Sequence, residues 1–309
     1  MRTLGTLAAP AALVAAVALA GCGSASSPDS KPKAHDTAAS TTSAEPEHRI
    51  AVTYEEPQPT KDTGYVGDIA TQEGTTPEAF TESILKDGGI DGVAEGFSDN
   101  FAFPADLTIA VRSGDGSPYY DPSTKTVNLF YSFAALTADI IKANTPKISD
   151  SELGKEWAAV NDFVLVHELG HAFVDVFAIP ITGREEDSVD GLATFFFTNE
   201  VEHGDEYAYD AANFFEELQG FQGAPDATQF ADEHSLSIQR AVDIACKVAG
   251  SSDQDMQIIA STGLVPDARL ARCPSEYQQN FRAWSTLLAP HFRPGHGPSA
   301  SASPTAASS

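Results

Sequence analysis

The sequence predicts an α+β fold in which a mainly helical domain carries a small β-sheet beside one long helix. Two β-rich segments lie near each other in the first half of the chain, and most of the rest has apolar residues at helical spacing. No internal repeat is present. Residues 51–292 are long enough for one domain with a sizeable core, and we assign them to it.

The small sheet is predicted from Leu107–Val111 and Thr126–Tyr131, which are rich in β-branched and aromatic residues. Glycine, proline and aspartate in Ser113–Pro118 and Tyr120–Thr124 supply turns between them. The two segments are therefore expected to be strands of one small sheet.

Several further segments have apolar residues every three or four positions, the pattern of a helix with one buried face. These predicted helices are Pro77–Leu85, Phe133–Lys142, Tyr207–Leu218, Ser237–Val248 and Glu276–Leu288. Together with the two helices described next, they make the domain mainly helical.

A long helix is predicted to start near Ser149. Ser149 and Glu152 have the spacing of a capping box, which satisfies backbone N–H groups at the start of a helix. The next proline is Pro180, so the helix can continue without a break.

This helix contains the sequence His167-Glu168-Leu-Gly-His171. The two histidines project from one face, where both imidazoles can bind one zinc ion, and Glu168 beside them can act as a general base. The alternative is a buried helix with two hydrogen-bonded core histidines, which are costly to bury without a metal or partners. Gly170 lowers the helix propensity by about 1 kcal/mol relative to alanine, and we interpret it as a place where another backbone passes close by.

A second helix is predicted shortly afterwards, opened by a capping box of Thr182 and Glu185, so that Glu185 is the cap. Glu186 and Asp190 share a face of this helix. Glu186 is our third zinc ligand, and Asp190 is placed to accept the free N–H of a ligating imidazole. Asp187 and Asp190 remain alternative ligands, because the helix register can shift by a residue or two. The other interpretation is that these acids only complement the positive helix N-terminus.

The HExxH helix followed by an ExxxD helix resembles the gluzincin group of zinc metallopeptidases. The stretch HELGHAFVDVFAIPITGREEDSVDGLAT closely resembles a bacterial family of exported proteins classed as metallopeptidases. The resemblance extends roughly from Gly67 to Leu288 and includes Asp232-Glu-His-Ser-Leu236. It implies a mainly helical, zincin-like metallopeptidase domain.

The resemblance also implies the roles of the site residues. It makes His167, His171 and Glu186 the ligands of Zn²⁺, Glu168 the catalytic base, and Asp190 the partner of a ligand. The gap of 15 residues from His171 to Glu186 is shorter than in thermolysin-like members, which keeps the two aspartates open as alternatives.

These residues together predict a hydrolytic site. With three protein ligands, zinc keeps a fourth position for water, whose pKa falls to about 7. Glu168 would take a proton from this water and later give it to the leaving amine. His234 is our candidate donor to the developing oxyanion, with Tyr207 and Tyr209 as second choices. The alternative for His234 is a capping or salt-bridging histidine next to two acids.

The strand before the long helix is our candidate for substrate binding. An edge strand can bind an extended peptide through main-chain hydrogen bonds, and we choose Thr126–Tyr131 for this position. The alternative is a purely structural hairpin.

The N-terminal residues 1–21 have a charged start, an apolar stretch from Ala11 to Ala20 and small residues before Cys22, which predicts an export signal. The sequence Leu19-Ala-Gly-Cys22 resembles a bacterial lipobox, which implies cleavage before Cys22 and acylation of its thiol. Each buried CH₂ contributes about 0.8 kcal/mol, so the lipid would hold the protein on the extracytoplasmic face of the cell membrane. A transmembrane anchor and a soluble secreted product are the alternatives.

Residues 22–50 and 293–309 are rich in small and polar residues and proline, and they predict a disordered tether and a disordered tail. His35, His48 and His296 lie in or beside these segments, so we exclude them as active-site ligands.

Cys246 and Cys273 remain as a pair once Cys22 is assigned to lipid. An oxidising exterior favours a disulfide between them. A metal role is not indicated, because neither cysteine belongs to a CxxC pattern or has a neighbouring histidine.

The formal net charge is −26, from 18 basic and 44 acidic residues. This charge argues against nucleic acid as a partner, keeps the domain off anionic lipid head groups, and favours basic or neutral substrates. The sequence therefore predicts a membrane-anchored zinc peptidase that acts on peptides or proteins. The alternatives are a non-catalytic surface lipoprotein that binds a ligand or partner on a peptidase-like scaffold, and a zinc hydrolase of non-peptide amides.

Overall fold

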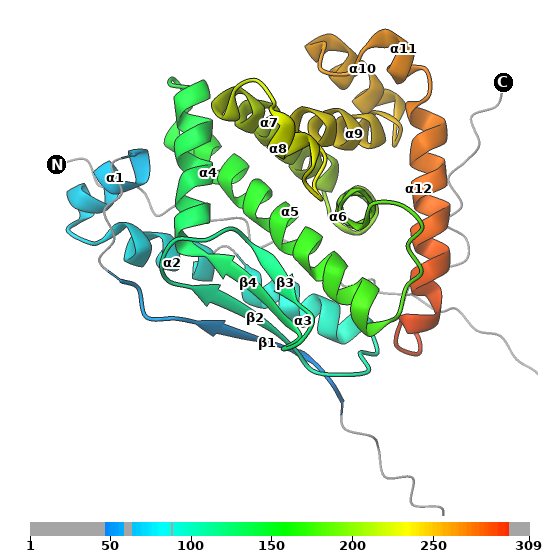
Figure 1. Cartoon of the computed structure of the whole chain (residues 1–309), viewed down its shortest axis with the longest axis horizontal. Helices are drawn as coiled ribbons and strands as arrows, with labels where there is room; N and C mark the ends of the chain where they lie inside the picture. Colours follow the sequence, from blue (N-terminus) through cyan, green and yellow to red (C-terminus); the bar gives the residue numbers. More distant parts are fainter. Residues whose placement is uncertain (1–46, 59–63, 88, 297–309) are drawn as a thin grey trace, which may run out of the picture.

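The computed structural model describes residues 47–58, 64–87 and 89–296. Its fold class is α+β, as predicted, with a small sheet beside a larger group of helices (Figure 1). The long helix α5 (Asp150–Val176) lies between the two parts: it contacts the sheet on one side and further helices on the other. The strands are β1 (Ile50–Tyr54), β2 (Leu107–Arg112), β3 (Tyr119–Asp121) and β4 (Thr126–Phe130).

The sheet has the strand order β1-β2-β4-β3, in which β1, β2 and β4 are parallel and β3 is antiparallel to β4. The predicted edge position of Thr126–Tyr131 is therefore wrong, because β2 and β3 pair with both sides of β4. The first four residues of β4 are all buried, the pattern of a strand covered on both faces. The strand also ends at Phe130, and Tyr131 begins the next helix.

The other helices are α1 (Tyr65–Glu73), α2 (Pro77–Asp87), α3 (Ile90–Asn100), α4 (Tyr131–Asn144), α6 (Glu185–Glu200), α7 (Gly204–Gln222), α8 (Ala227–Phe230), α9 (Ser237–Ala249), α10 (Asp253–Thr262), α11 (Asp267–Leu270) and α12 (Cys273–Leu288), with a 3₁₀ turn at Ala289–His291.

Besides α5 and α6, the predicted helices correspond to α2, α4, α7, α9 and α12, whereas α1, α3, α10 and the short helices α8 and α11 were not predicted. In α3, Gly92 and Gly96 each lower the helix propensity by about 1 kcal/mol relative to alanine. Its stability comes instead from burial of Ile90, Val93 and Phe97.

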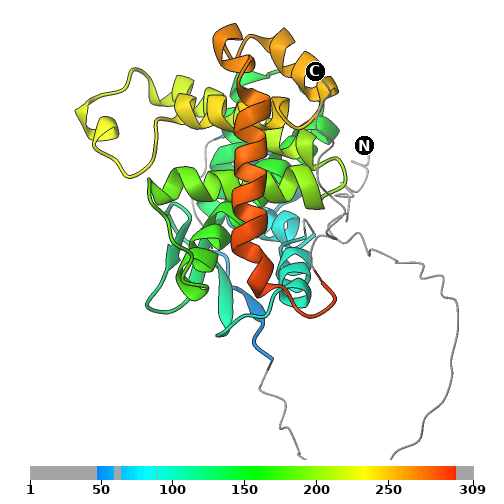
Figure 2. The same cartoon turned by 90° about the vertical axis from the view of Figure 1, so that its right-hand side faces the viewer.

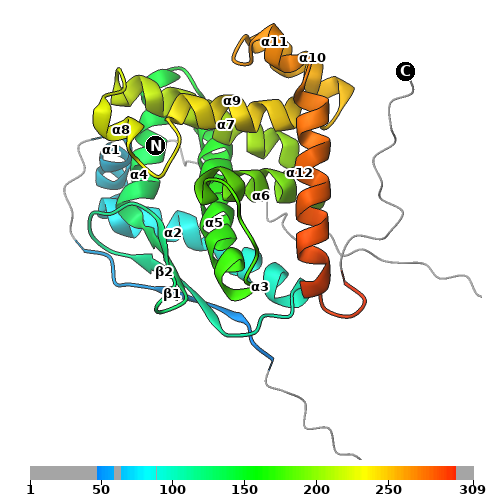
Figure 3. The ribbon, with the colours of Figure 1, turned by 45° about the vertical axis from the view of Figure 1, so that its right-hand side comes forward.

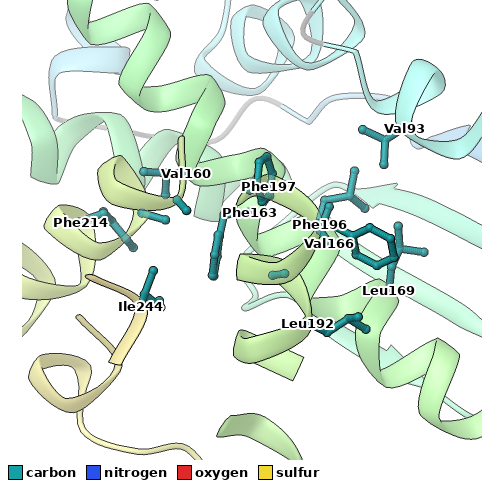
Figure 4. Packing of buried hydrophobic residues seen from close by; sticks show 14 of the residues in the cluster. Val93, Val160, Phe163, Val166, Leu169, Leu192, Phe196, Phe197, Phe214 and Ile244 are labelled. Atoms are coloured by element: carbon teal, nitrogen blue, oxygen red, sulfur yellow. The ribbon is translucent and has the colours of Figure 1, made fainter. Parts of the chain in front are cut away.

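The hydrophobic core surrounds α5, where side chains of several helices converge (Figure 4). Phe163 of α5 is fully buried and its ring stacks on Phe197 of α6, with centroids 5.9 Å apart. Further along α5, Phe173 makes edge contacts with Phe97 of α3 and Phe196 of α6. These contacts fix α6 against α5, and both helices carry candidate site residues.

The predicted disulfide between Cys246 and Cys273 is confirmed, and their Cα atoms are 5.0 Å apart. It joins the last turn of α9 to the start of α12, which crosses the domain in Figure 2 and meets the end of α9 in Figure 3. Asn280 of α12 in turn donates a hydrogen bond to the carbonyl of Gly191 in α6. The disulfide therefore connects α9 to α12, and α12 in turn contacts α6.

Replacing both cysteines, Cys246→Ala with Cys273→Ala, should lower the free energy of unfolding by about 3–4 kcal/mol. The bridge closes a loop with a sequence separation of 27, and losing it returns chain entropy to the unfolded state. For a domain of this size the Tm should fall by about 10 °C. Thermal unfolding followed by circular dichroism measures the Tm. The wild-type protein in the presence of a reductant should show the same decrease in Tm. Equal Tm values for mutant and wild type would contradict the prediction.

Among the residues that the structure describes, no helix is long and apolar enough to cross a membrane. The predicted export signal, Cys22, and most of the tether and tail lie outside these residues. At the N-terminal limit of the domain, β1 begins at Ile50. At the C-terminal limit, Nε of Arg293 donates a hydrogen bond to the carbonyl of Ser98 at 2.8 Å. The folded part thus extends slightly beyond the predicted range 51–292.

Candidate metal centre

The helix α5 presents the two motif histidines on one face. The predicted capping box at its start is confirmed: Glu152 N donates to Ser149 Oγ at 3.3 Å, and Ser149 N donates to the Glu152 carboxylate at 3.2 Å. His167, about two and a half turns before the end of the helix, is 3% exposed, and His171, one turn later, is half-buried. Their ring centroids are 5.1 Å apart. An uninterrupted helix therefore aims both imidazoles at one point.

The start of α6 differs from the prediction. The helix begins at Glu185 and is preceded by Arg184, whose side chain makes no capping hydrogen bond, so the Thr182–Glu185 capping box is wrong. The carboxylate of Glu185 lies 2.8 Å from His171 Nδ1 instead. The imidazole belongs to another helix, and a local sequence pattern could not reveal this contact.

The close approach of α6 to α5 depends on Gly170. A Cβ atom at this position would lie 2.8 Å from the Cβ of Val189 in α6, which is too close for two carbon atoms. The close neighbour of Gly170 is thus a side chain, where we expected a backbone. The absent side chain lets the N-terminal turn of α6 reach the histidines of α5.

The carboxylate of Glu186 lies among three imidazoles. Its Oε2 is 3.1 Å from His167 Nε2 and 3.0 Å from His234 Nε2, and its Oε1 is 3.2 Å from His171 Nε2. His167, Glu186 and His234 each offer a ligand atom, and these atoms lie within 4.8 Å of one another. His171 contacts Glu186 but falls outside this group. His234 belongs to it, although we had considered His234 as an oxyanion donor or as a capping or salt-bridging histidine.

Each motif histidine contacts a second carboxylate through Nδ1. Asp190 Oδ1 is 2.7 Å from His167 Nδ1, the contact that we expected, and Glu185 makes the corresponding contact with His171. Acceptors at Nδ1 fix the tautomer and leave the Nε2 lone pair facing the centre. Glu185 was predicted only as a helix cap, and its contact with His171 was not expected.

The segment between α7 and α9 carries His234 and is held by α6. Asp187 accepts a hydrogen bond from Ser235 Oγ at 2.7 Å, and Arg184 Nη1 donates to the carbonyl of His234 at 3.3 Å. Asp232 Oδ1 accepts from His234 N at 2.9 Å and lies 3.0 Å from Nδ1 of the ring. The carboxylate of Asp187 is thus engaged away from the three imidazoles, which disfavours it as a ligand.

Arg240 of α9 completes the surroundings of Asp190. Its Nε donates to Asp190 Oδ2 at 2.8 Å and its Nη2 donates to Oδ1 at 2.7 Å. No sequence pattern predicted a role for Arg240. The two residues lie 50 positions apart, and no spacing rule connects them.

Electrostatics at the centre favour positive charge. Burial alone would lower the pKa of His171, but Glu186 and Glu185 outweigh it and raise this pKa to about 9. The pKa of His167 is also raised, because Asp190 and Glu186 outweigh its burial. The surrounding imidazoles hold the pKa of Glu186 far below its usual range despite burial. A divalent cation fits such surroundings.

Glu168 has a different environment. It is 6% exposed, and burial raises the pKa of its carboxyl group although His167 and His171 oppose this shift. No residue that the structure describes donates a hydrogen bond to its carboxylate. The side chain is therefore available for proton transfer.

The donor set fits a metal ion bound by imidazole nitrogen and carboxylate oxygen. With bonds of about 2.1 Å, two imidazoles on one tetrahedral zinc ion have ring centres roughly 5 Å apart. The centroids of His167 and His171 meet this distance at 5.1 Å, whereas those of His167 and His234 are 6.4 Å apart. The centroid distances therefore favour His171 over His234 as the second imidazole that binds the same ion as His167.

The two tyrosines that were second choices as oxyanion donors, and two of the histidines excluded as ligands, make other contacts. Tyr207 and Tyr209 pack against the hydrophobic core, His48 lies 3.1 Å from Asp106, and His296 lies 3.3 Å from Asn100. His35 is outside the described residues.

A family model named DUF4344, with the description "Putative metallopeptidase", matches residues 71–288 of the chain. The match includes both α5 and α6 and extends through the segment that carries His234 to the end of α12. No curated protein and no solved structure matches the chain.

Proposed function

The chain belongs to this family of metallopeptidases, and from that premise we propose that it is a zinc-dependent peptidase with its active site between α5 and α6. One observation carries the proposal: the carboxylate of Glu186 lies 3.0 to 3.2 Å from Nε2 of three histidines. Imidazole and carboxylate are the ligands of catalytic zinc sites, which keep one position open.

His167, His171 and Glu186 would hold the ion. Asp190 and Glu185 would support the two imidazoles through their Nδ1 atoms. When bound, zinc would supply a Lewis acid that polarises the substrate carbonyl and lowers the pKa of water to about 7.

Glu168 would move the proton. A carboxyl group whose pKa is raised by burial can take a proton from the attacking water and then release it to the leaving amine. Its position between the two histidines on α5 puts it beside the reacting atoms. Both steps are general acid–base catalysis by one residue.

His234 would donate a hydrogen bond from Nε2 to the substrate oxygen that gains negative charge. The pKa of this imidazole is raised mainly by its contact with Glu186 and to a smaller extent by Asp232. The raised pKa favours the form with hydrogen on both nitrogens. Asp232 contacts Nδ1 of the ring and Arg184 holds the backbone carbonyl of His234, and together they would keep the ring facing the centre.

We also propose that an acyl group on Cys22 anchors the enzyme to the extracytoplasmic face of the cell membrane. The support is the export signal and the lipobox-like sequence at the N-terminus. The disulfide between α9 and α12 supports an oxidising compartment. Peptides or proteins at the cell surface would then be the substrates.

Metal analysis combined with a peptide library tests the proposal. The purified protein should contain about one zinc ion per chain and should cleave library peptides, with the new termini identified by mass spectrometry. A chelator should abolish cleavage, and added zinc should restore it.

The outcomes separate the candidate functions. Zinc bound without cleavage of any peptide would leave the binding role of a surface lipoprotein, and cleavage of small amides alone would indicate a non-peptide amidase. Cleavage that survives complete removal of metal would refute the zinc mechanism.

A further inference from the structure

Arg240 has an unusual set of contacts for an arginine in the interior. Its side chain is 13% exposed, and its guanidinium lies over the ring of Phe215 in α7, with Cζ 3.9 Å from the centroid. Its Nε and Nη2 reach the two oxygens of Asp190 in a bidentate pair. Nη2 is also 3.4 Å from His167 Nδ1, so the group adjoins the imidazole itself.

The contacts form one chain from α9 to the centre. Arg240 holds both oxygens of Asp190, Oδ1 of Asp190 meets Nδ1 of His167 at 2.7 Å, and Nε2 of His167 faces Glu186. Asp190 is buried, so water cannot replace a lost partner. The direction of its carboxylate is therefore set by the arginine.

We propose that Arg240 is a positioning residue for the metal centre, acting through Asp190 on His167. The inference rests on the proposed zinc site. The guanidinium of Arg240 matches both oxygens of the Asp190 carboxylate with two parallel N–H···O bonds and stacks on the ring of Phe215. The ammonium group of a lysine is a point charge and would fix no orientation. Arg240 thereby determines the direction of the imidazole.

The location of Arg240 explains how two parts of the site are linked. α9 begins at Ser237, directly after the segment that carries His234, so one continuous stretch supplies both the oxyanion donor and the arginine. The α9 helix is in turn tied to α12 by the disulfide at its other end. The position of α9 thus affects the centre from outside the HExxH and ExxxD helices.

Zinc affinity tests the proposal. Arg240→Gln should raise the Kd for zinc by about 10- to 100-fold, the usual effect of losing a partner of a ligating histidine. Competition with a chromogenic chelator measures the Kd. The matched control is Arg269→Gln: Arg269 also pairs with two carboxylates, Asp243 and Glu276, but touches no residue of the centre. The control should keep the Kd within about two-fold.

A double-mutant cycle with Asp190→Asn separates positioning from general stability. If Arg240 acts through Asp190, the double mutant should bind zinc no more weakly than Asp190→Asn alone. Cobalt substituted for zinc gives a second readout, because its visible absorption bands shift when the direction of a ligand changes. Arg240→Lys should fold even if Arg240→Gln does not, and it should show the weaker binding and the cobalt shift.

The outcomes remain distinct. Wild-type protein that binds no zinc would refute the proposed function. If the wild-type protein binds zinc and the Arg240 variants bind it equally well or more tightly, only the proposed role of Arg240 is overturned. Fully additive effects of the Arg240 and Asp190 substitutions would overturn that role too.

Discussion

Replacing Glu168 by glutamine should lower kcat by about 10²- to 10⁴-fold, the range that general acid–base catalysis contributes. Glutamine keeps the shape of the side chain but cannot take a proton from water. The three proposed ligands are untouched, so the protein should retain its zinc. Initial rates on a peptide identified from the library give kcat, and metal analysis of the same sample gives the zinc content.

The matched control is Glu156→Gln on the same helix. Glu156 is half-buried, and burial raises the pKa of its carboxyl group too, but it lies roughly three turns before Glu168. This variant should keep kcat within about two-fold. Equal rates for Glu168→Gln and wild type would show that another group is the base, and equal losses in both variants would show a general effect of neutralising acids on α5.

Replacing Glu186 by glutamine should raise the Kd for zinc by more than roughly 100-fold, beyond the effect of losing a partner of a ligand. Glu186 is the carboxylate that contacts all three imidazoles, and a neutral amide is a poor zinc ligand. Hydrolysis should disappear at zinc concentrations that saturate the wild type. Chelator competition gives the Kd, and activity as a function of added zinc gives an independent value.

Asp187→Asn is the matched control, because it makes the same chemical change one residue later. Asp187 contacts Ser235 beside His234, so the variant should keep its zinc and lose part of kcat through a less well-held His234. Loss of zinc from Asp187→Asn with retention by Glu186→Gln would reverse the ligand assignment. Retention by both variants would point to His234 as the third ligand.

Helix α5 shows what local patterns predict well. Its start follows from Ser149 and Glu152, and the four-residue spacing of His167 and His171 puts both rings on one face whatever surrounds the helix. The disulfide was predictable for a similar reason, since only two cysteines remain after Cys22.

The errors concern neighbours that are remote in sequence. The strand Thr126–Phe130 is interior because β3 and β2 flank it, and strand order is a property of the sheet as a whole. Glu185 has the spacing of a cap with Thr182, but an imidazole from α5 engages its carboxylate. Helix α3 contains two glycines and is stabilised by packing, which propensity does not measure.

The sequence by itself determined the α+β class, the α5 helix, its pair of histidines with Glu168 between them, and the cysteine pair, because each depends on spacing within one element or on a count. The helical spacing of Glu186 and Asp190 predicted that both face the histidines, but only the tertiary structure decided what Glu185 and Asp187 contact and which imidazoles surround Glu186. Consecutive residues of a helix point about 100° apart, so the placement of α6 against Gly170 directs Glu185 to His171, Glu186 to the three imidazoles, and Asp187 to Ser235. The contact of Arg240 with Asp190 has the same origin, because only the packing of α9 beside α6 brings them together.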